Sequence, residues 1–314
     1  MTARPLLAQL ALRAASRAHT AGTDCSCEAA ATLADRSDAT VVRHAGTVAK
    51  AHAPGTGRAN LTARLAVAAA LPDVLLPPLA ASPAGLHGRL VTFWPYGAPV
   101  DPVDPDAAPW EAAGALLARL HRTPVPAGLP PMRGPAKAAL AVARLTAAAG
   151  PHPASAAVLG AWRALPAWAR AETAASGPEA ALCHGDLHLG QLVRHPAPDG
   201  PWRLIDVDDL GVGVPAWDLA RPAAWFACGL LPPQEWTRFL DAYRAGGGPA
   251  VPAADDPWPA LDVPARALTV QTAARAVTES VAEGRPLDEV EECLVDACAR
   301  MGSVPPRSAA DSPK

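Results

Sequence analysis

Two acidic residues of the sequence stand where carboxylates could carry out chemistry. Asp186 lies in the segment C-H-G-D-L-H-L-G-Q-L-V at 183–193, after a short apolar strand, with a glycine directly before it. Asp206 ends a second apolar strand, 20 residues further along. A carboxylate in a tight loop can accept or orient the proton of an incoming hydroxyl. A carboxylate at a strand end can hold Mg²⁺ against phosphate oxygens. We therefore expect Asp186 to act as a base and Asp206 as the principal metal ligand.

These residues belong to a longer pattern that resembles a known family. The H-G-D loop is followed by a hairpin and by L-I-D-V-D-D-L-G-V-G-V-P-A-W-D-L-A at 204–220. Together they resemble the catalytic and metal-binding segments of the aminoglycoside phosphotransferase and choline-kinase-like family. The resemblance implies an α+β, protein-kinase-like bilobal fold with a small antiparallel-sheet N-lobe and an α-rich C-lobe. It also implies a Mg²⁺-dependent enzyme that moves the γ-phosphoryl group of ATP or GTP to a hydroxyl of a small molecule.

The resemblance gives roles to residues outside the two segments. Lys50, in V-A-K-A-H, stands where the family has a lysine that contacts the α- and β-phosphates. Ser37, in the turn R-S-D-A, is expected to cover the nucleotide. Phe93 or Trp94 is expected to contact the adenine at a hinge, and the alternative for both rings is packing in the core. Gln191 stands where the family usually has Asn, and its amide oxygen is expected to bind the metal.

The sequence also departs from the family pattern. No acidic residue occurs between Asp38 and Asp73, so the helix expected there cannot supply the Glu that normally pairs with the lysine. We expect Lys50 to be oriented instead by Asp206 or by the phosphates. Val214 also interrupts the more familiar string G-V-G-D-P.

Three further acids lie in the second segment. We expect Asp208 and Asp209 to be solvated loop acids, since exposed acids are common in loops. Asp218 is expected to brace the catalytic loop.

Two alternatives stay open. The string L-I-D-V-D-D-L also fits a haloacid-dehalogenase-like phosphatase, with Asp206 as nucleophile and Asp208 as acid, but that motif belongs near the start of a parallel α/β domain. The missing Glu and the presence of Gln191 would suit a pseudokinase, which binds nucleotide without turnover. Nucleotide binding without product release would identify that second case.

Composition narrows the class of protein. Half of the 314 residues are hydrophobic, 18% are charged, and the formal net charge is −3. The chain therefore has no basic surface of the kind that nucleic-acid binding needs. No apolar run approaches the roughly 20 residues that cross a bilayer. We expect a cytoplasmic protein whose partners are a nucleotide and a small hydroxylated acceptor, and the sequence leaves its oligomeric state open.

The six cysteines lack the paired spacing of a zinc site and the density of a disulfide-rich fold. Cys25 and Cys27 form a lone C-x-C, for which we expect no structural metal.

The periodicity of apolar residues and the positions of proline and glycine predict the domain boundaries. We expect an N-terminal helix or flexible segment over 1–24, an N-lobe over 25–97, an α-rich C-lobe over 98–301 and a disordered tail over 302–314. Within the N-lobe, β-branched runs on either side of Ala45-Gly46 predict a hairpin. Apolar residues at helical spacing predict the helices of the C-lobe.

Overall fold

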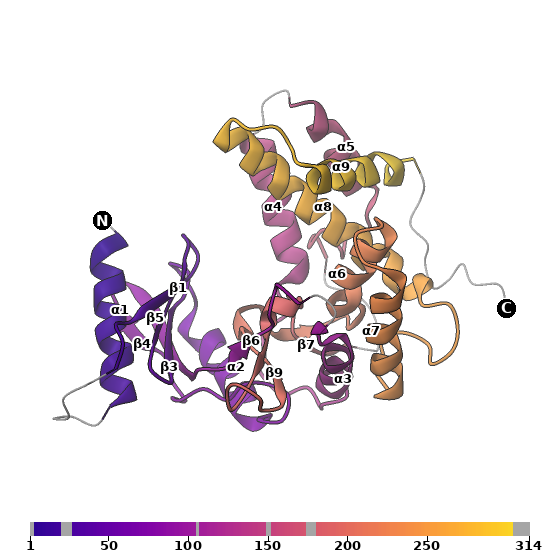
Figure 1. Ribbon diagram of the computed structural model, residues 1–314. Coiled ribbons are helices and arrows are strands. Elements are labelled where there is room, and N and C mark those ends of the chain that lie inside the picture. The colour runs from indigo at the N-terminus through magenta and orange to yellow at the C-terminus, as the bar shows by residue number, and fades with distance from the viewer. Residues whose placement is uncertain (1–2, 20–26, 105–106, 149–151, 174–179, 304–314) are drawn as a thin grey trace. The chain divides into compact units, whose positions relative to one another are not determined.

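The computed structural model describes residues 3–19, 27–104, 107–148, 152–173 and 180–303 (Figure 1). Most of the tail expected over 302–314, and Cys25, lie outside these ranges. The contacts divide the chain into two compact units. Unit 1 comprises Met1–Ala108, Pro126–Leu129 and Gly190–Asp208. Unit 2 comprises Pro109–Val125, Pro130–Leu189 and Asp209–Lys314.

Unit 1 contains a five-stranded antiparallel sheet in the order β1-β2-β3-β5-β4. Its strands are β1 (Ala31–Asp35), β2 (Thr40–His44), β3 (Thr47–Ala51), β4 (Ala84–Leu86) and β5 (Arg89–Pro95). The predicted hairpin is confirmed: β2 pairs with β3, and Ala45 takes a positive φ of 49° at the turn. This sheet is the antiparallel N-terminal part expected from the sequence.

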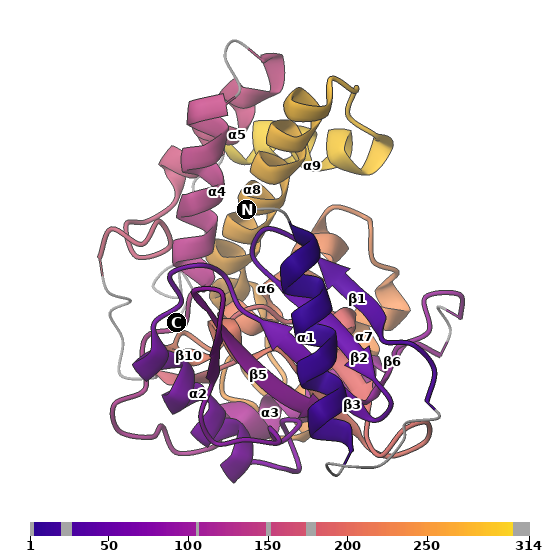
Figure 2. The same cartoon turned by 90° about the vertical axis from the view of Figure 1, so that its left-hand side faces the viewer.

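The two faces of this sheet differ. Buried and half-buried residues alternate along β2 and β3, as expected when successive side chains point to opposite faces. Helix α1 (Ala3–Ala18) packs across β2 and β3 on one face (Figure 2). Leu10 and Ala14 of α1 are buried in one core with Val42, Ala49 and Phe93. Residues 43, 48 and 50 consequently belong to the opposite face.

Unit 1 has two further parts. Helix α2 (Arg58–Ala70) follows β3, and a three-stranded antiparallel sheet has the order β6-β8-β9. Its strands are β6 (Ala98–Pro99), β8 (Leu192–Arg194) and β9 (Trp202–Leu204). Strand β9 of this sheet ends two residues before the second candidate acid, Asp206.

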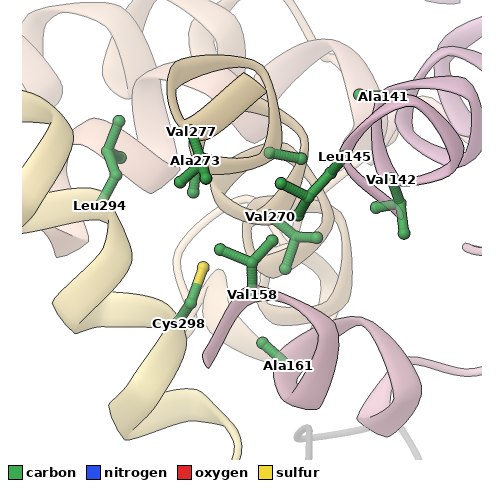
Figure 3. Packing of buried hydrophobic residues seen from close by; sticks show 11 residues of the cluster. Ala141, Val142, Leu145, Val158, Ala161, Val270, Ala273, Val277, Leu294 and Cys298 are labelled. Carbon is green, nitrogen blue, oxygen red and sulfur yellow. The ribbon is translucent and has the colours of Figure 1, made fainter. Parts of the chain in front are cut away.

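Unit 2 is mostly helical. Its helices are α3 (Trp110–His121), α4 (Gly134–Ala148), α5 (Pro153–Ala164), α6 (Ala216–Ala227), α7 (Pro233–Ala245), α8 (Trp258–Glu283) and α9 (Glu289–Met301). Strands β7 (Ala181–Cys183) and β10 (Gly211–Gly213) form an antiparallel pair. A core of small and branched side chains joins α4, α5, α8 and α9, and Val158, Val270 and Val277 are fully buried in it (Figure 3). None of the helices in the described residues combines the length and hydropathy needed to span a membrane.

The contacts divide the chain differently from the expected domains. Helix α1 is the helix expected within 1–24, and it packs on the sheet of unit 1. Residues 98–108 and 190–208, expected in the α-rich lobe, group with unit 1, because β8 pairs with both β6 and β9.

Two elements end at identifiable breaks. Helix α5 stops at Ala164, because Leu165 precedes Pro166 and takes an extended conformation. Strand β9 stops at Leu204, and a short 3₁₀ helix (Val207–Asp209) follows.

Candidate active site

Lys50 forms the centre of an acidic cluster in unit 1. Its Nζ lies 2.6 Å from Oδ1 of Asp206 and 3.0 Å from Oδ2 of Asp208. Strand β3 holds the lysine on the face of the sheet opposite α1, and the turn after β9 presents both acids. The expectation that Asp206 orients Lys50 in place of the missing Glu matches this arrangement. The second partner, Asp208, was expected to be solvated, and that expectation is wrong because the side chain is ion-paired and only 25% exposed.

The charges of this cluster reinforce one another. Burial alone would lower the pKa of Lys50, but the two carboxylates raise it above its ordinary value. Burial alone would raise the pKa of Asp208, but the charge of Lys50 and contact with His52 lower it well below its usual range. Lys50 and Asp208 therefore keep their opposite charges at neutral pH and attract each other.

A chain of polar contacts extends from Asp208 across the sheet. Nδ1 of His52 lies 2.7 Å from Asp208, and its Nε2 lies 2.8 Å from the hydroxyl of Thr92. The indole N–H of Trp94 donates to the same hydroxyl at 2.8 Å. With its proton on Nδ1, His52 accepts from the Thr92 hydroxyl through Nε2, whereas its Nδ1 approaches Asp208 closely without hydrogen-bond geometry. Trp94 therefore lies on the Lys50 face of the sheet, where a nucleotide contact stays a prediction.

Phe93 lies on the other face. It pairs in register with Ala49, and its ring is buried in the core beneath α1, where Arg17 lies over it. The prediction that this ring contacts a nucleotide is therefore wrong. The reason is the two-residue period of the strand, which puts neighbouring aromatic residues on opposite faces.

Gln191 and Asp206 are brought together by the pairing of β8 with β9. The backbone N–H of Ile205 donates to the carbonyl oxygen of Gln191 at 2.9 Å, which places Gln191 beside the residue that precedes Asp206. The Gln191 side chain is buried. Asp206 has a φ of +65°, which is uncommon for a residue other than glycine and is enriched at functional sites. Ser37 lies exposed in the turn between β1 and β2, and its role stays a prediction.

Asp186, in unit 2, has two cationic partners. Oδ2 lies 2.7 Å from Nζ of Lys137, and Oδ1 lies 2.8 Å from Nη2 of Arg221. Lys137 comes from α4 and Arg221 from α6. The same lysine lies 2.7 Å from Asp209, so it bridges two carboxylates. Asp209 is therefore buried and ion-paired, and the expectation that it is a solvated loop acid is wrong.

The pKa values of the two carboxyl groups that Lys137 bridges shift in opposite directions. Burial favours the neutral form of Asp186, but Lys137 and Arg221 lower its pKa well below the usual range. Burial raises the pKa of Asp209, and the neighbouring charge of Asp186 adds to that rise. Asp186 therefore stays ionised at neutral pH, as a carboxylate held between two cations.

Asp218 braces the loop that carries Asp186, as expected. Its carboxylate accepts hydrogen bonds from the backbone N–H groups of His184, at 2.6 Å, and Gly185, at 2.7 Å. Its Oδ2 also lies 3.0 Å from Nε2 of His121, a side chain buried within unit 2. Asp218 and Arg221 lie three residues apart on α6, so one face of this helix supports both the loop backbone and the Asp186 side chain.

The loop also requires glycine at position 185. Gly185 has a φ of +85°, and a Cβ atom there would lie 2.4 Å from the carbonyl oxygen of Asp209. Glycine is the residue that meets both conditions without strain.

Sequence reasoning missed Lys137, Arg221 and His52 as members of these clusters. The rarity of lysine in the sequence could have pointed to Lys137. The chain contains three lysines, at 50, 137 and 314, although arginine supplies nearly all of its other positive charge. Two of the three lie against the acidic residues of the two motifs.

Comparison with known proteins agrees with the resemblance read from the motifs. A model of the phosphotransferase enzyme family, APH, matches residues 32–259. No curated protein matches the sequence significantly. Several solved structures share the fold over nearly the whole chain.

Three of these structures illustrate the range of proteins that share the fold. The macrolide 2'-phosphotransferase MphH from Brachybacterium faecium is 22% identical, with 95% of this chain and 98% of that chain covered and a TM-score of 0.51. A choline/ethanolamine kinase family protein from Mesorhizobium loti is 20% identical, with 97% and 96% covered and a TM-score of 0.52. A thermostable mutant of the aminoglycoside phosphotransferase APH(4)-Ia, in a ternary complex with AMP-PNP and hygromycin B, is 13% identical, with 88% and 95% covered and a TM-score of 0.58.

These likenesses confirm the expected fold. They also argue against the dehalogenase-like alternative, since every strand pair within the sheets of the described residues is antiparallel. With a family model covering residues 32–259 and both motifs in place, the chain belongs to the phosphotransferase enzyme family and is a kinase of small molecules.

Proposed function

We propose that this enzyme transfers the γ-phosphoryl group of ATP or GTP to a hydroxyl of a small molecule. The acceptor oxygen forms a bond to the γ-phosphorus, the bond from that phosphorus to the β,γ-bridging oxygen breaks, and the hydroxyl proton leaves toward Asp186. Similar structures hold ADP with spectinomycin or AMP-PNP with hygromycin B, which supports a nucleotide donor and a hydroxylated acceptor. The observation that supports the proposal most is the 2.6 Å contact of Lys50 with Asp206, because an ammonium group suits phosphate and a carboxylate suits a metal ion.

The donor atoms beside Lys50 fit a magnesium ion. Mg²⁺ prefers oxygen ligands, typically one or two carboxylates together with substrate phosphates and water. Asp206 is 30% exposed, and Asp208 and the amide of Gln191 are the further oxygen donors on the same segment. When bound, the ion would neutralise phosphate charge. We propose Asp206 as its main protein ligand and Gln191 as a second.

Lys50 has a separate task in this proposal. With nucleotide absent, its ammonium group neutralises Asp206 and Asp208. With nucleotide present, we expect it to donate to the α- and β-phosphates while Asp208 and His52 keep it on its face of the sheet. Trp94, on that face, and Ser37, in the exposed turn before β2, are proposed to contact the nucleotide.

Asp186 acts on the acceptor. Arg221 and Lys137 keep its carboxylate ionised and fix both oxygens, so an acceptor hydroxyl would donate to an oriented anion. The contribution of such a positioned acceptor to the rate is about 10² or more.

Product release over a panel of acceptors tests the function. ADP or GDP release would be measured with Mg-ATP and Mg-GTP and with macrolides, aminocyclitols, aminoglycosides, choline, ethanolamine and simple sugars. We expect acceptor-dependent release in the wild type and a fall of about 100-fold or more in Asp186→Asn, with nucleotide affinity changed by no more than a few fold. Tight nucleotide binding without release for any acceptor would favour the pseudokinase alternative.

A further inference from the structure

Three side chains in unit 1, far from one another in sequence, direct possible metal-ligand atoms at one point. His19 follows α1, Cys27 precedes β1, and His44 is the last residue of β2. The ring nitrogen, thiol sulfur and ring nitrogen that they offer lie within 4.8 Å of one another. Nε2 of His19 lies 3.1 Å from Nε2 of His44 and 3.5 Å from Sγ of Cys27.

These separations match the edges of a tetrahedral zinc site. Zn–N bonds of about 2.0–2.1 Å and a Zn–S bond of about 2.3 Å, at tetrahedral angles, separate two nitrogens by about 3.3 Å and a nitrogen from a sulfur by about 3.5 Å. Two imidazoles and a thiolate are also the donors that zinc selects, whereas Mg²⁺ and Ca²⁺ select oxygens. The donor set and its spacing thus point to the same ion.

Hydrogen bonds alone would have to use one ring nitrogen twice. Nε2 of a neutral His19 offers either one proton or one lone pair, yet both Nε2 of His44 and Sγ of Cys27 lie within hydrogen-bonding distance of it. The rings are 85° apart with their centroids separated by 5.2 Å, so the two nitrogens meet without stacking. Two histidines that bind one metal ion also approach each other through their ring nitrogens, with their rings inclined and not stacked.

We propose that His19, Cys27 and His44 bind a Zn²⁺ ion. The ion joins the end of α1 to the end of β2 and the start of β1. It thereby holds α1, with its core residues Leu10 and Ala14, against the sheet. The expectation of no structural metal considered only the cysteine spacing, and histidines 8 residues before and 17 residues after Cys27 supply what that spacing lacks.

Metal content and cobalt spectra test the site directly. The full chain would be purified without chelator, dialysed against metal-free buffer and analysed for zinc by mass spectrometry. We expect roughly one zinc per chain, held by the three side chains with a water molecule in the fourth position. Replacement by Co²⁺ should give the intense d–d bands of a tetrahedral ion and a thiolate-to-cobalt charge-transfer band.

Variants separate this site from the other histidines and cysteines. His19→Ala and Cys27→Ser should each lower the zinc content at least tenfold, and Cys27→Ser should remove or weaken the charge-transfer band. His87→Asn and Cys293→Ser are matched controls that should keep both; Asn suits the positive φ of position 87. Wild-type zinc content below about a tenth per chain would overturn the proposal, and so would wild-type content and spectra in both site variants.

Stability gives a readout that does not depend on zinc content in the variants. A zinc-selective chelator, added with Mg²⁺ held in excess, should lower the melting temperature of the wild type and leave that of Cys27→Ser unchanged, because binding to the folded state alone stabilises it. An equal effect on both proteins would count against the site.

Discussion

The ammonium group of Lys50 lies between the carboxylates of Asp206 and Asp208, at 2.6 and 3.0 Å. Helix α2 contains no acidic residue, so within this cluster the two aspartates supply the negative charge that orients the lysine. The carboxylate of Asp206 is also the proposed main ligand of the metal. Nucleotide and magnesium must therefore compete with, or rearrange, an existing ion pair, and the predictions for Lys50 and Asp206 test this.

Replacing Lys50 by Met should impair nucleotide use specifically. The variant keeps the length of the side chain and removes its charge, so the KM for nucleotide should rise by about tenfold or more while the acceptor KM changes little. Steady-state kinetics with each substrate varied in turn would measure both. Arg13→Met, which removes an exposed charge from α1 on the other face of the sheet, is the control. A larger change in the acceptor KM would mean that Lys50 serves another role.

Replacing Asp206 by Asn should abolish magnesium-dependent nucleotide binding. Asn has the same shape and tolerates the positive φ at this position, so the fold should persist while the metal loses a charged ligand. Calorimetry with Mg-ATP, and with ATP in chelator, would compare the variant with the wild type. Asp199→Asn, in an exposed turn, is the control. Wild-type affinity for Mg-ATP in Asp206→Asn would exclude the residue as the main ligand.

Gln191 tests whether an amide can replace the family's usual Asn. The additional methylene costs roughly 0.5 kcal/mol in side-chain entropy, which is too little to prevent binding. Gln191→Asn should therefore be as active as the wild type or slightly more active. Gln191→Leu removes the oxygen and should lower turnover by about tenfold, or about 1.4 kcal/mol. If the Leu variant were fully active, magnesium would have to be held by Asp206 and Asp208.

The pairing of Lys137 with Asp186 predicts how activity depends on pH. The pKa of Asp186 lies below its ordinary value, which is about 4. The carboxylate should thus stay ionised, and kcat/KM should show no acid limb from this group between about pH 5 and pH 7.

Lys137→Met should change this profile. It removes the main charge that opposes the effect of burial, so the pKa rises and the limb moves toward neutral pH. The stability that the ion pair provides is present above the unfolded pKa and is lost as pH falls below it. Arg238→Met, which breaks a surface pair with Glu111, is the control. Identical pH profiles for Lys137→Met and the wild type would contradict the prediction.

Alanine variants of Gly185 and Gly229 distinguish the cost of backbone strain from the cost of a steric clash. Gly185→Ala should lower the free energy of unfolding by roughly 3 kcal/mol, through a positive φ and a clash with the backbone of Asp209. Gly229 also has a positive φ, +74°, but a Cβ atom added there would meet nothing within 4 Å, so Gly229→Ala should cost about 1 kcal/mol. Urea denaturation of both variants would measure the difference. Equal losses would mean that the loop moves to accommodate the added methyl group.

The sequence predicted those features that depend on local pattern. The β2–β3 hairpin follows from two β-branched runs around Ala45-Gly46, and the loop carrying Asp186 follows from its glycine and its spacing to Asp206. Such features depend on residues that are close together in the sequence, so their residue types and spacing can be recognised there.

Long-range partners could not be predicted in this way. Lys137 reaches Asp186 across 49 residues, and His52 reaches Asp208 across 156. Nothing in the local sequence near either acid identifies its partner, because the pairing depends on how α4 and β3 are packed. The face on which Phe93 lies was missed for a related reason, since it depends on the register of β5 with β3.

The alternation along β3 makes the length of the turn at Ala45-Gly46 more critical than its composition. Ala49 packs beneath α1, and Lys50 points to the opposite face. A one-residue insertion or deletion in the turn that shifted the pairing of β3 would exchange these faces, placing the ammonium group in an apolar core and an alanine among carboxylates. Laboratory libraries that vary the turn by substitution should therefore yield many folded members, whereas those that vary it by single-codon indels should yield almost none.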